Sequence, residues 1–155
     1  MSKDLSIFFS PITKILKRNI YETVNPSKSD PYSYRSVLRK KIIKKSILHG
    51  FVDNHHIIPQ QFKNHDIIHR VKFNIDFSYN IAILPNAKFR HHKVYHDFPD
   101  VLIHERSHVF YSNYVKQNLN EMMTVVDEDE LKLEFWLFTE HLKHSMYHKT
   151  DVPWN

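Results

Sequence analysis

The chain of 155 residues contains no cysteine and a single glycine, Gly50. Without cysteine there can be no disulfide bond and no thiolate-bound zinc, so any metal must be held by His, Asp, Glu or Asn. One glycine excludes a glycine-rich phosphate loop of the Walker or Rossmann type, because such loops need several positions that tolerate positive φ. No apolar run approaches the roughly 18 residues of a membrane-spanning helix.

The first residues, MSKDLSIFF, lack the charged, apolar and small-residue order of a secretory signal peptide. We therefore expect a protein of the cytoplasm or another intracellular compartment, without a membrane partner. The length and the 41% hydrophobic content suit a single domain over residues 1–155.

Histidine is abundant, with 13 residues, and the net charge of +5 is unevenly spread. Residues 1–50 carry 11 Lys and Arg against 3 Asp and Glu, which leaves +8, whereas residues 51–155 carry 11 against 14, which leaves −3. A basic first part joined to a histidine-rich middle indicates a polyanionic partner, although a solvated surface accounts for the same charge.

Apolar periodicity predicts helices on both sides of this middle part. One begins at Ser10-Pro11, and a second runs from about Ser36 to His49, with Gly50 as a left-handed C-terminal cap. A third is predicted from Ser107 to about Met122. The last, over 127–148, has an acidic first turn and a basic end, which match the helix dipole.

Three stretches carry the chemistry. DNHHIIP at 53–59 and SYNIAILPN at 78–86 each combine a polar start, an apolar run and a proline, and predict strands at about 54–58 and 80–84. HERSH at 104–108 places two histidines four apart, on one face of a helix start. Neighbouring strand residues point to opposite faces, so His55 and His56 can divide two tasks, metal binding and activation of water. We expect the three stretches to converge on one metal ion.

The same stretches resemble a known family. HHIIP at 55–59, FNIDFSYNIAILP at 73–85 and HERSHVFYSNYV at 104–115 are similar to the AHH group of His-Me finger nucleases, in the HNH or ββα-metal superfamily. The resemblance implies an α+β, mostly helical fold. Its ββα-metal finger, a short β-hairpin plus a helix over 51–122, would lie between a basic helical part at 1–50 and the C-terminal helix.

Carried over to this sequence, the resemblance implies a role for each residue. His55 would bind the metal, and His56 would be the general base. Asn80 would hold the base or the backbone of the finger, unless it only caps a turn. His104 and His108 would complete the metal shell, with His92 and His96 as the alternative pair. The chain departs from the family pattern in having Asn54, Ile81, Glu105, Arg106 and Val109 where alanine, two glycines and a proline are usual.

The remaining cations are candidates for phosphate contacts. Arg90 and Arg106 flank the expected site, and Arg106 could steady the transition state. Nucleic acid would contact the basic helix at Arg39, Lys40, Lys44 and Lys45, although such a run is often a solvated helix face.

Together these features predict an endonuclease that uses a histidine general base and one divalent metal ion, Mg, Zn, Ni or Mn. DNA is a better candidate substrate than RNA, and the resemblance suggests a toxin or defence role with a neutralising immunity protein. The alternatives are a metal-stabilised nucleic-acid-binding module that does not cut, and an HD-type phosphohydrolase built on His96-Asp97.

Overall fold

The computed structural model describes residues 30–97, 101–105, 108–148, 150 and 152–154. The main elements are α3 (Val37–Lys45), β1 (Val52–His56), α4 (Asp66–Arg70), β2 (Ile81–Pro85), α5 (Val109–Glu121) and α6 (Glu128–His148). Short 3-10 helices join them at Gln60–Phe62, Ser78–Asn80, Ala87–His91, Lys93–Asp97 and Met122–Thr124. The structure thus confirms the predicted mostly helical α+β fold. The helix expected at Ser10-Pro11 lies outside the described residues.

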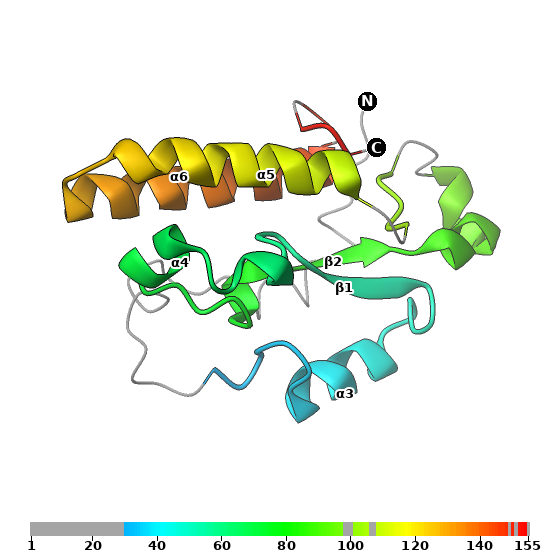
Figure 1. Cartoon of the computed structure of the whole chain (residues 1–155). Helices are drawn as coiled ribbons and strands as arrows, with labels where there is room; N and C mark the ends of the chain where they lie inside the picture. Colours follow the sequence, from blue (N-terminus) through cyan, green and yellow to red (C-terminus); the bar gives the residue numbers. More distant parts are fainter. Residues whose placement is uncertain (1–29, 98–100, 106–107, 149, 151, 155) are drawn as a thin grey trace.

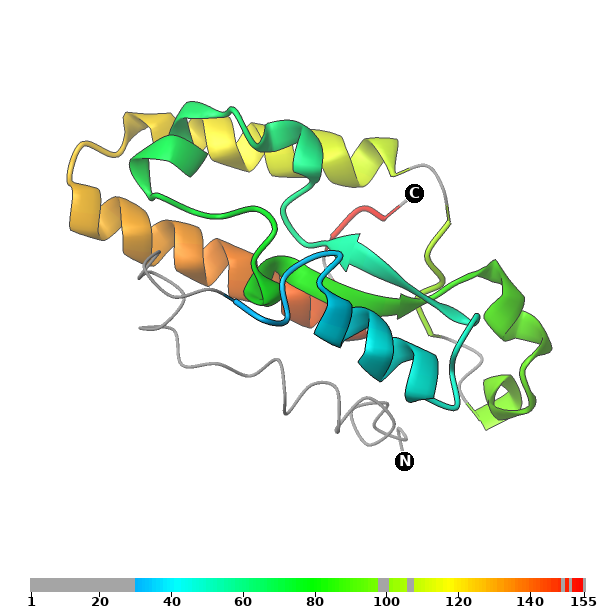
Figure 2. The ribbon, with the colours of Figure 1, turned by 90° about the horizontal axis from the view of Figure 1, so that it is seen from below.

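A two-stranded antiparallel sheet forms the centre of the fold. Its register runs from Val52 opposite Pro85 to His56 opposite Ile81. The long helices α5 and α6 lie side by side on one face of the sheet, and α3 lies on the other (Figures 1 and 2). Residues 57–80, which include α4, join the strands in place of a tight hairpin turn. Because helices cover both faces, β2 is buried along its whole length.

Strand alternation divides the apolar side chains into two clusters. Ala82 and Leu84 pack against α5 and α6, whereas Ile83 packs with Val52 on the side of α3. Helix α5 adds a stripe with a spacing of four residues to the larger cluster, formed by Tyr111, Val115 and Leu119. Among the helices in the described part of the chain, none is both long enough and apolar enough to span a bilayer.

The helix ends differ in detail from the prediction. Helix α3 begins after Ser36, whose hydroxyl accepts a hydrogen bond from the backbone of Arg39 at 3.2 Å, but it ends at Lys45. Gly50 has the expected positive φ of 84°, yet it serves the turn into β1 and not the end of the helix. Helix α6 begins after Asp127, whose carboxylate accepts hydrogen bonds from the backbone nitrogens of Asp129 and Glu130.

Arg39 corrects one prediction about nucleic-acid contacts. Its side chain is 2% exposed, because it faces the sheet and not solvent. The guanidinium donates to the side-chain oxygen of Asn54 at 2.7 Å and to the carbonyls of Tyr32 and Ile81 at 3.2 and 3.3 Å. Burial lowers the pKa of Arg39 to about 10, so it stays charged at neutral pH. Arg39 therefore joins α3 to both strands and is not available to bind phosphate.

Replacing Arg39 by alanine should lower the free energy of unfolding by about 2–4 kcal/mol, because three acceptors lose a charged donor. Urea denaturation followed by circular dichroism measures the loss. Lys40→Ala, one residue further along and exposed, is the control and should change stability by less than about 0.5 kcal/mol. Equal effects of the two substitutions would contradict the structural role of Arg39.

Candidate metal and active site

Three imidazoles from β1, from the start of α5 and from the segment before α5 converge beside the sheet. His55 is on β1, His108 is the N-cap residue of α5, and His104 lies in the segment before that helix. The ring centroids are 5.0 Å apart for His55 and His104, 5.3 Å for His55 and His108, and 5.1 Å for His104 and His108. One nitrogen from each ring lies within 4.8 Å of the others. A single ion can bridge such a group, since imidazole nitrogens bind zinc at about 2.0–2.1 Å.

The local backbone explains how the three rings meet. His55 pairs with Ala82 and so points to the face of the sheet that α5 covers. His104 is not on a helix, as the four-residue spacing had suggested. Its backbone is extended, forms a bridge with Asn86 and donates to the carbonyl of Pro85 at 2.6 Å. The helical prediction for His104 was therefore wrong.

The ring nitrogens of this cluster have few partners in the protein. His55 Nε2 and both ring nitrogens of His108 are buried and have no hydrogen-bond partner among the described residues. A buried polar atom left without a partner costs about 1–3 kcal/mol, so these atoms call for a ligand. His104 differs, because its Nδ1 lies 3.4 Å from a carboxylate oxygen of Asp53, as in the carboxylate–histidine pairs that orient metal ligands.

The protonation of the cluster also suits a cation. Burial and the neighbouring histidines lower the pKa of His55 well below its ordinary value, and burial with the nearby His104 lowers the pKa of His108. Both rings are therefore neutral at pH 7, which is the form that binds metal. Imidazole ligands suit Zn²⁺, Ni²⁺ or a similar divalent ion.

His56 has a different environment from its neighbour. Its Nε2 lies 3.1 Å from a carboxylate oxygen of Asp76, and its ring centroid is 4.3 Å from that of Tyr34. An ionised carboxylate can only accept, so Nε2 carries the proton and Nδ1 is the atom able to take another. Burial lowers the pKa of His56, and the hydrogen bond with Asp76 partly opposes this effect. Sequence reasoning missed Asp76, although it lies inside the FNIDFS block at 73–78.

A single cavity of about 530 Å³ joins His56 to the three clustered histidines. Adjacent strand residues point apart, but β1 ends at His56, and the cavity opens at this end of the strand. Its lining consists of Asn54, His55, His56, Pro59, Gln60, Gln61, His104, His108, Val109, Tyr111, Ser112 and Asn113.

Asn80 is fully buried and does not line the cavity. Its side-chain oxygen accepts from the backbone of Ile58 at 2.7 Å, and its amide donates to the carbonyls of Ile58 and Ile75 at 3.0 and 2.8 Å. Tyr111 donates a further hydrogen bond to the carbonyl of Ile57. Asn80 thus fastens the backbone that follows the histidine pair to the segment that precedes Asp76.

The predicted phosphate-binding residues and the alternative histidine pair lie outside the histidine cluster, as far as the structure describes them. Arg90 is paired with Glu105 at 2.5 Å, and Arg106 is outside the described residues. His92 packs on the rings of Phe51 and Phe89, so within the described ranges neither it nor the exposed His96 joins the histidine cluster. Lys40, Lys44 and Lys45 are exposed on α3, across the sheet from α5.

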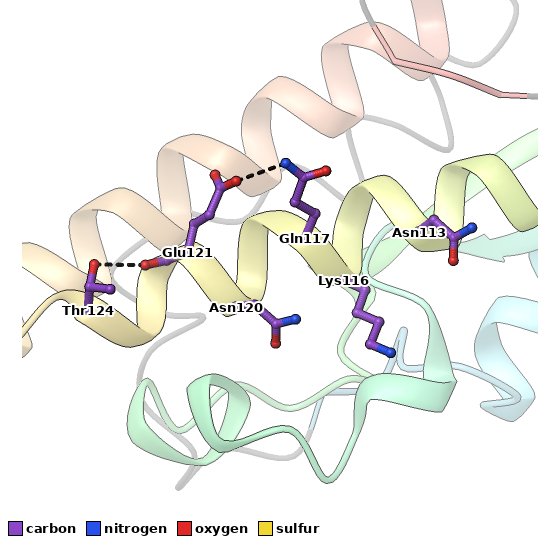
Figure 3. A pocket seen from close by; sticks show the side chains of 6 residues that line it. All are labelled: Asn113, Lys116, Gln117, Asn120, Glu121 and Thr124. Atoms are coloured by element: carbon purple, nitrogen blue, oxygen red, sulfur yellow. Dashed lines mark hydrogen bonds between the residues drawn. The ribbon is translucent and has the colours of Figure 1, made fainter.

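A second hollow of about 500 Å³ follows the exposed side of α5 and shares Asn113 with the cavity (Figure 3). It holds one cation, Lys116, and one anion, Glu121, which accepts a hydrogen bond from Gln117 at 2.9 Å. The balanced charge and the lack of histidine make it a weaker candidate for chemistry. Its remaining lining residues are Asn120 and Thr124.

Comparison with known families agrees with this geometry. The model of a nuclease family of the HNH/ENDO VII superfamily with conserved AHH matches residues 44–135. The chain belongs to this AHH nuclease family. No curated protein and no solved structure matches it significantly. The matched span of this AHH nuclease contains the sheet, all three clustered histidines, His56, Asp76 and Asn80.

Metal titration tests whether the clustered histidines of this AHH nuclease bind the metal, and not the alternative pair His92 and His96. His104→Ala should weaken Zn²⁺ or Ni²⁺ binding by at least about 100-fold, because one of three ligands is lost. His92→Ala should leave the affinity unchanged. Isothermal titration calorimetry measures both, and a loss of affinity in the His92 variant alone would show that the wrong pair has been assigned.

Proposed function

We propose that this AHH nuclease is a metal-dependent endonuclease that hydrolyses phosphodiester bonds of DNA. The observation that carries the proposal is the shared cavity, where His56, outside the cluster, lies beside the three imidazoles that converge on one point. Such a site has both parts that the reaction needs, a group to activate water and a group to bind phosphate.

Each residue of the chain then has a task. His55, His104 and His108 would hold a divalent ion, which when bound would stabilise the charge that develops on the phosphate and on the leaving oxygen. His56 takes a proton from water at Nδ1, and the hydrogen bond from its Nε2 to Asp76 keeps the ring in the correct tautomer. Asn80 positions the backbone after His56.

The surrounding cations would bind the nucleic-acid backbone. Lys40, Lys44 and Lys45 are exposed and can contact phosphates outside the cavity. Arg90 lies on the surface beside the His104 segment through its pair with Glu105, which phosphate could replace as a partner. Arg106 would steady the transition state. Since these contacts ignore base identity, cutting would show little sequence preference.

Replacing His55 and replacing His56 should have different effects on cleavage and on metal binding. His56→Ala should abolish cleavage of plasmid DNA and leave metal binding intact, because His56 is outside the metal cluster. His55→Ala should lose both properties, and EDTA should stop the wild-type protein.

The control is His96→Ala, which changes an exposed histidine away from the cluster and should cut normally. Parallel assays on DNA and RNA of the same sequence decide the substrate. A wild-type protein that binds metal and nucleic acid but cuts neither would support the binding module instead.

The salt dependence of DNA binding tests whether the exposed lysines of α3 contact phosphates. Replacing Lys40, Lys44 and Lys45 together by glutamine should weaken DNA binding equally for unrelated sequences. It should also reduce the slope of log affinity against log salt by up to about 0.9 for each phosphate that a lysine no longer neutralises. Fluorescence anisotropy in the presence of EDTA measures this without cleavage. An unchanged slope would place the three lysines on a solvated face away from DNA.

A further inference from the structure

Residues 152–154, which follow α6 in the described part of the chain, lie at the histidine cluster. They lie close to the start of α5 (Figures 1 and 2). There the indole of Trp154 has ring centroids 4.5 Å from His108, 5.1 Å from His55 and 5.0 Å from Tyr111. Val152 and Trp154 also pack against the main apolar cluster, which fixes this segment to the core.

Trp154 contacts residues of the cavity without lining it. His55, His108 and Tyr111 all line the cavity, but Trp154, which contacts each of the three, does not. The imidazoles of His55 and His108 therefore border both the cavity and the indole. A flat ring in this position takes up space beside the imidazoles and limits their rotation.

The need for such a support differs among the three histidines. His104 is oriented by Asp53, in the way that metal-bound histidines are usually held by an acceptor on the second nitrogen. His108 has no such acceptor among the described residues, since neither of its buried ring nitrogens has a partner. The terminal torsion of a histidine side chain is broad and is not fixed by rotamer preference alone. Ring packing must therefore orient His108, and the indole of Trp154 lies closer to it than the rings of His55 and His104 do.

We propose that Trp154 is a positioning residue for the metal ligands. Its indole holds the rings of His108 and His55 so that their nitrogens converge with that of His104. The proposal rests on the proposed metal site. It assigns a task to a residue outside the matched span 44–135.

Fluorescence tests the contact directly, because the chain has two tryptophans, Trp136 and Trp154. In Trp136→Phe, Trp154 is the only indole, and saturating Ni²⁺ or Co²⁺ should quench most of its emission. In Trp154→Phe, the remaining Trp136 on α6 is the matched control and should be quenched far less. Equal quenching of the two variants would overturn the placement of Trp154 against the ligands.

Affinity tests the positioning role. Trp154→Ala should weaken Ni²⁺ binding by about 10–100-fold, as the loss of other supports of metal ligands does. Trp154→Phe should restore most of the affinity because it keeps a flat ring. Trp154→Leu, which keeps apolar bulk without a ring, should not.

Melting temperatures of the metal-free variants are measured first, and affinities are compared only between folded variants. The pair Trp154→Phe and Trp154→Leu still decides the question if Trp154→Ala fails to fold. If Trp154→Leu binds Ni²⁺ as tightly as the wild-type protein, the positioning role is wrong, but the proposed metal site is not contradicted. Failure of the wild-type protein to bind Ni²⁺, Co²⁺ or Zn²⁺ would overturn both the metal site and this inference.

Discussion

The site depends on where strand β1 ends. Adjacent residues of a strand point to opposite faces, so His55 and His56 can serve one cavity only if the strand stops directly after them. The backbone hydrogen bond from Ile57 to the carbonyl of Asn80, at 2.7 Å, and the two contacts between the Asn80 side chain and Ile58 fix that end. Hydrogen bonding after His56 thus holds the backbone on which the two imidazoles are placed.

Surroundings then give the same side chain two uses. Among the described residues, Asp53 is the carboxylate that lies next to a ring of the cluster, at His104, and Glu105 acts on His108 through its charge. His56 has the carboxylate of Asp76 on one nitrogen, which favours proton uptake on the other. In the proposed mechanism, two groups that titrate alike in water would thereby serve as a ligand and a base.

The sequence was informative where function depends on residue type and order. The histidine pair, Asn80 and the HERSH histidines could be named because these residues lie in short motifs. The prediction that Arg39 contacts nucleic acid was wrong, because helical periodicity does not show that its guanidinium reaches a backbone carbonyl of the sheet. The helical backbone predicted for His104 was wrong, because a spacing of four residues suggests a helix, whereas this residue forms a β-bridge with Asn86. Asp76 and Trp154 meet the histidines through contacts between residues distant in the sequence, which the motifs alone do not predict.

Residues outside the matched span 44–135 also contribute to the surroundings of the site. Tyr34, before the matched span, packs on His56, and its backbone nitrogen donates to the carbonyl of Asp76 at 2.8 Å. Asp30 accepts from the backbone of Ser78 at 2.6 Å and so helps to hold the connection that carries Asp76. The residue after Tyr34, Arg35, has a φ of 64°, a strained value for a residue other than glycine. Strain of this kind persists only where surrounding contacts compensate for it. Residues 30–35 therefore support the surroundings of His56, and Trp154 contacts His55 and His108.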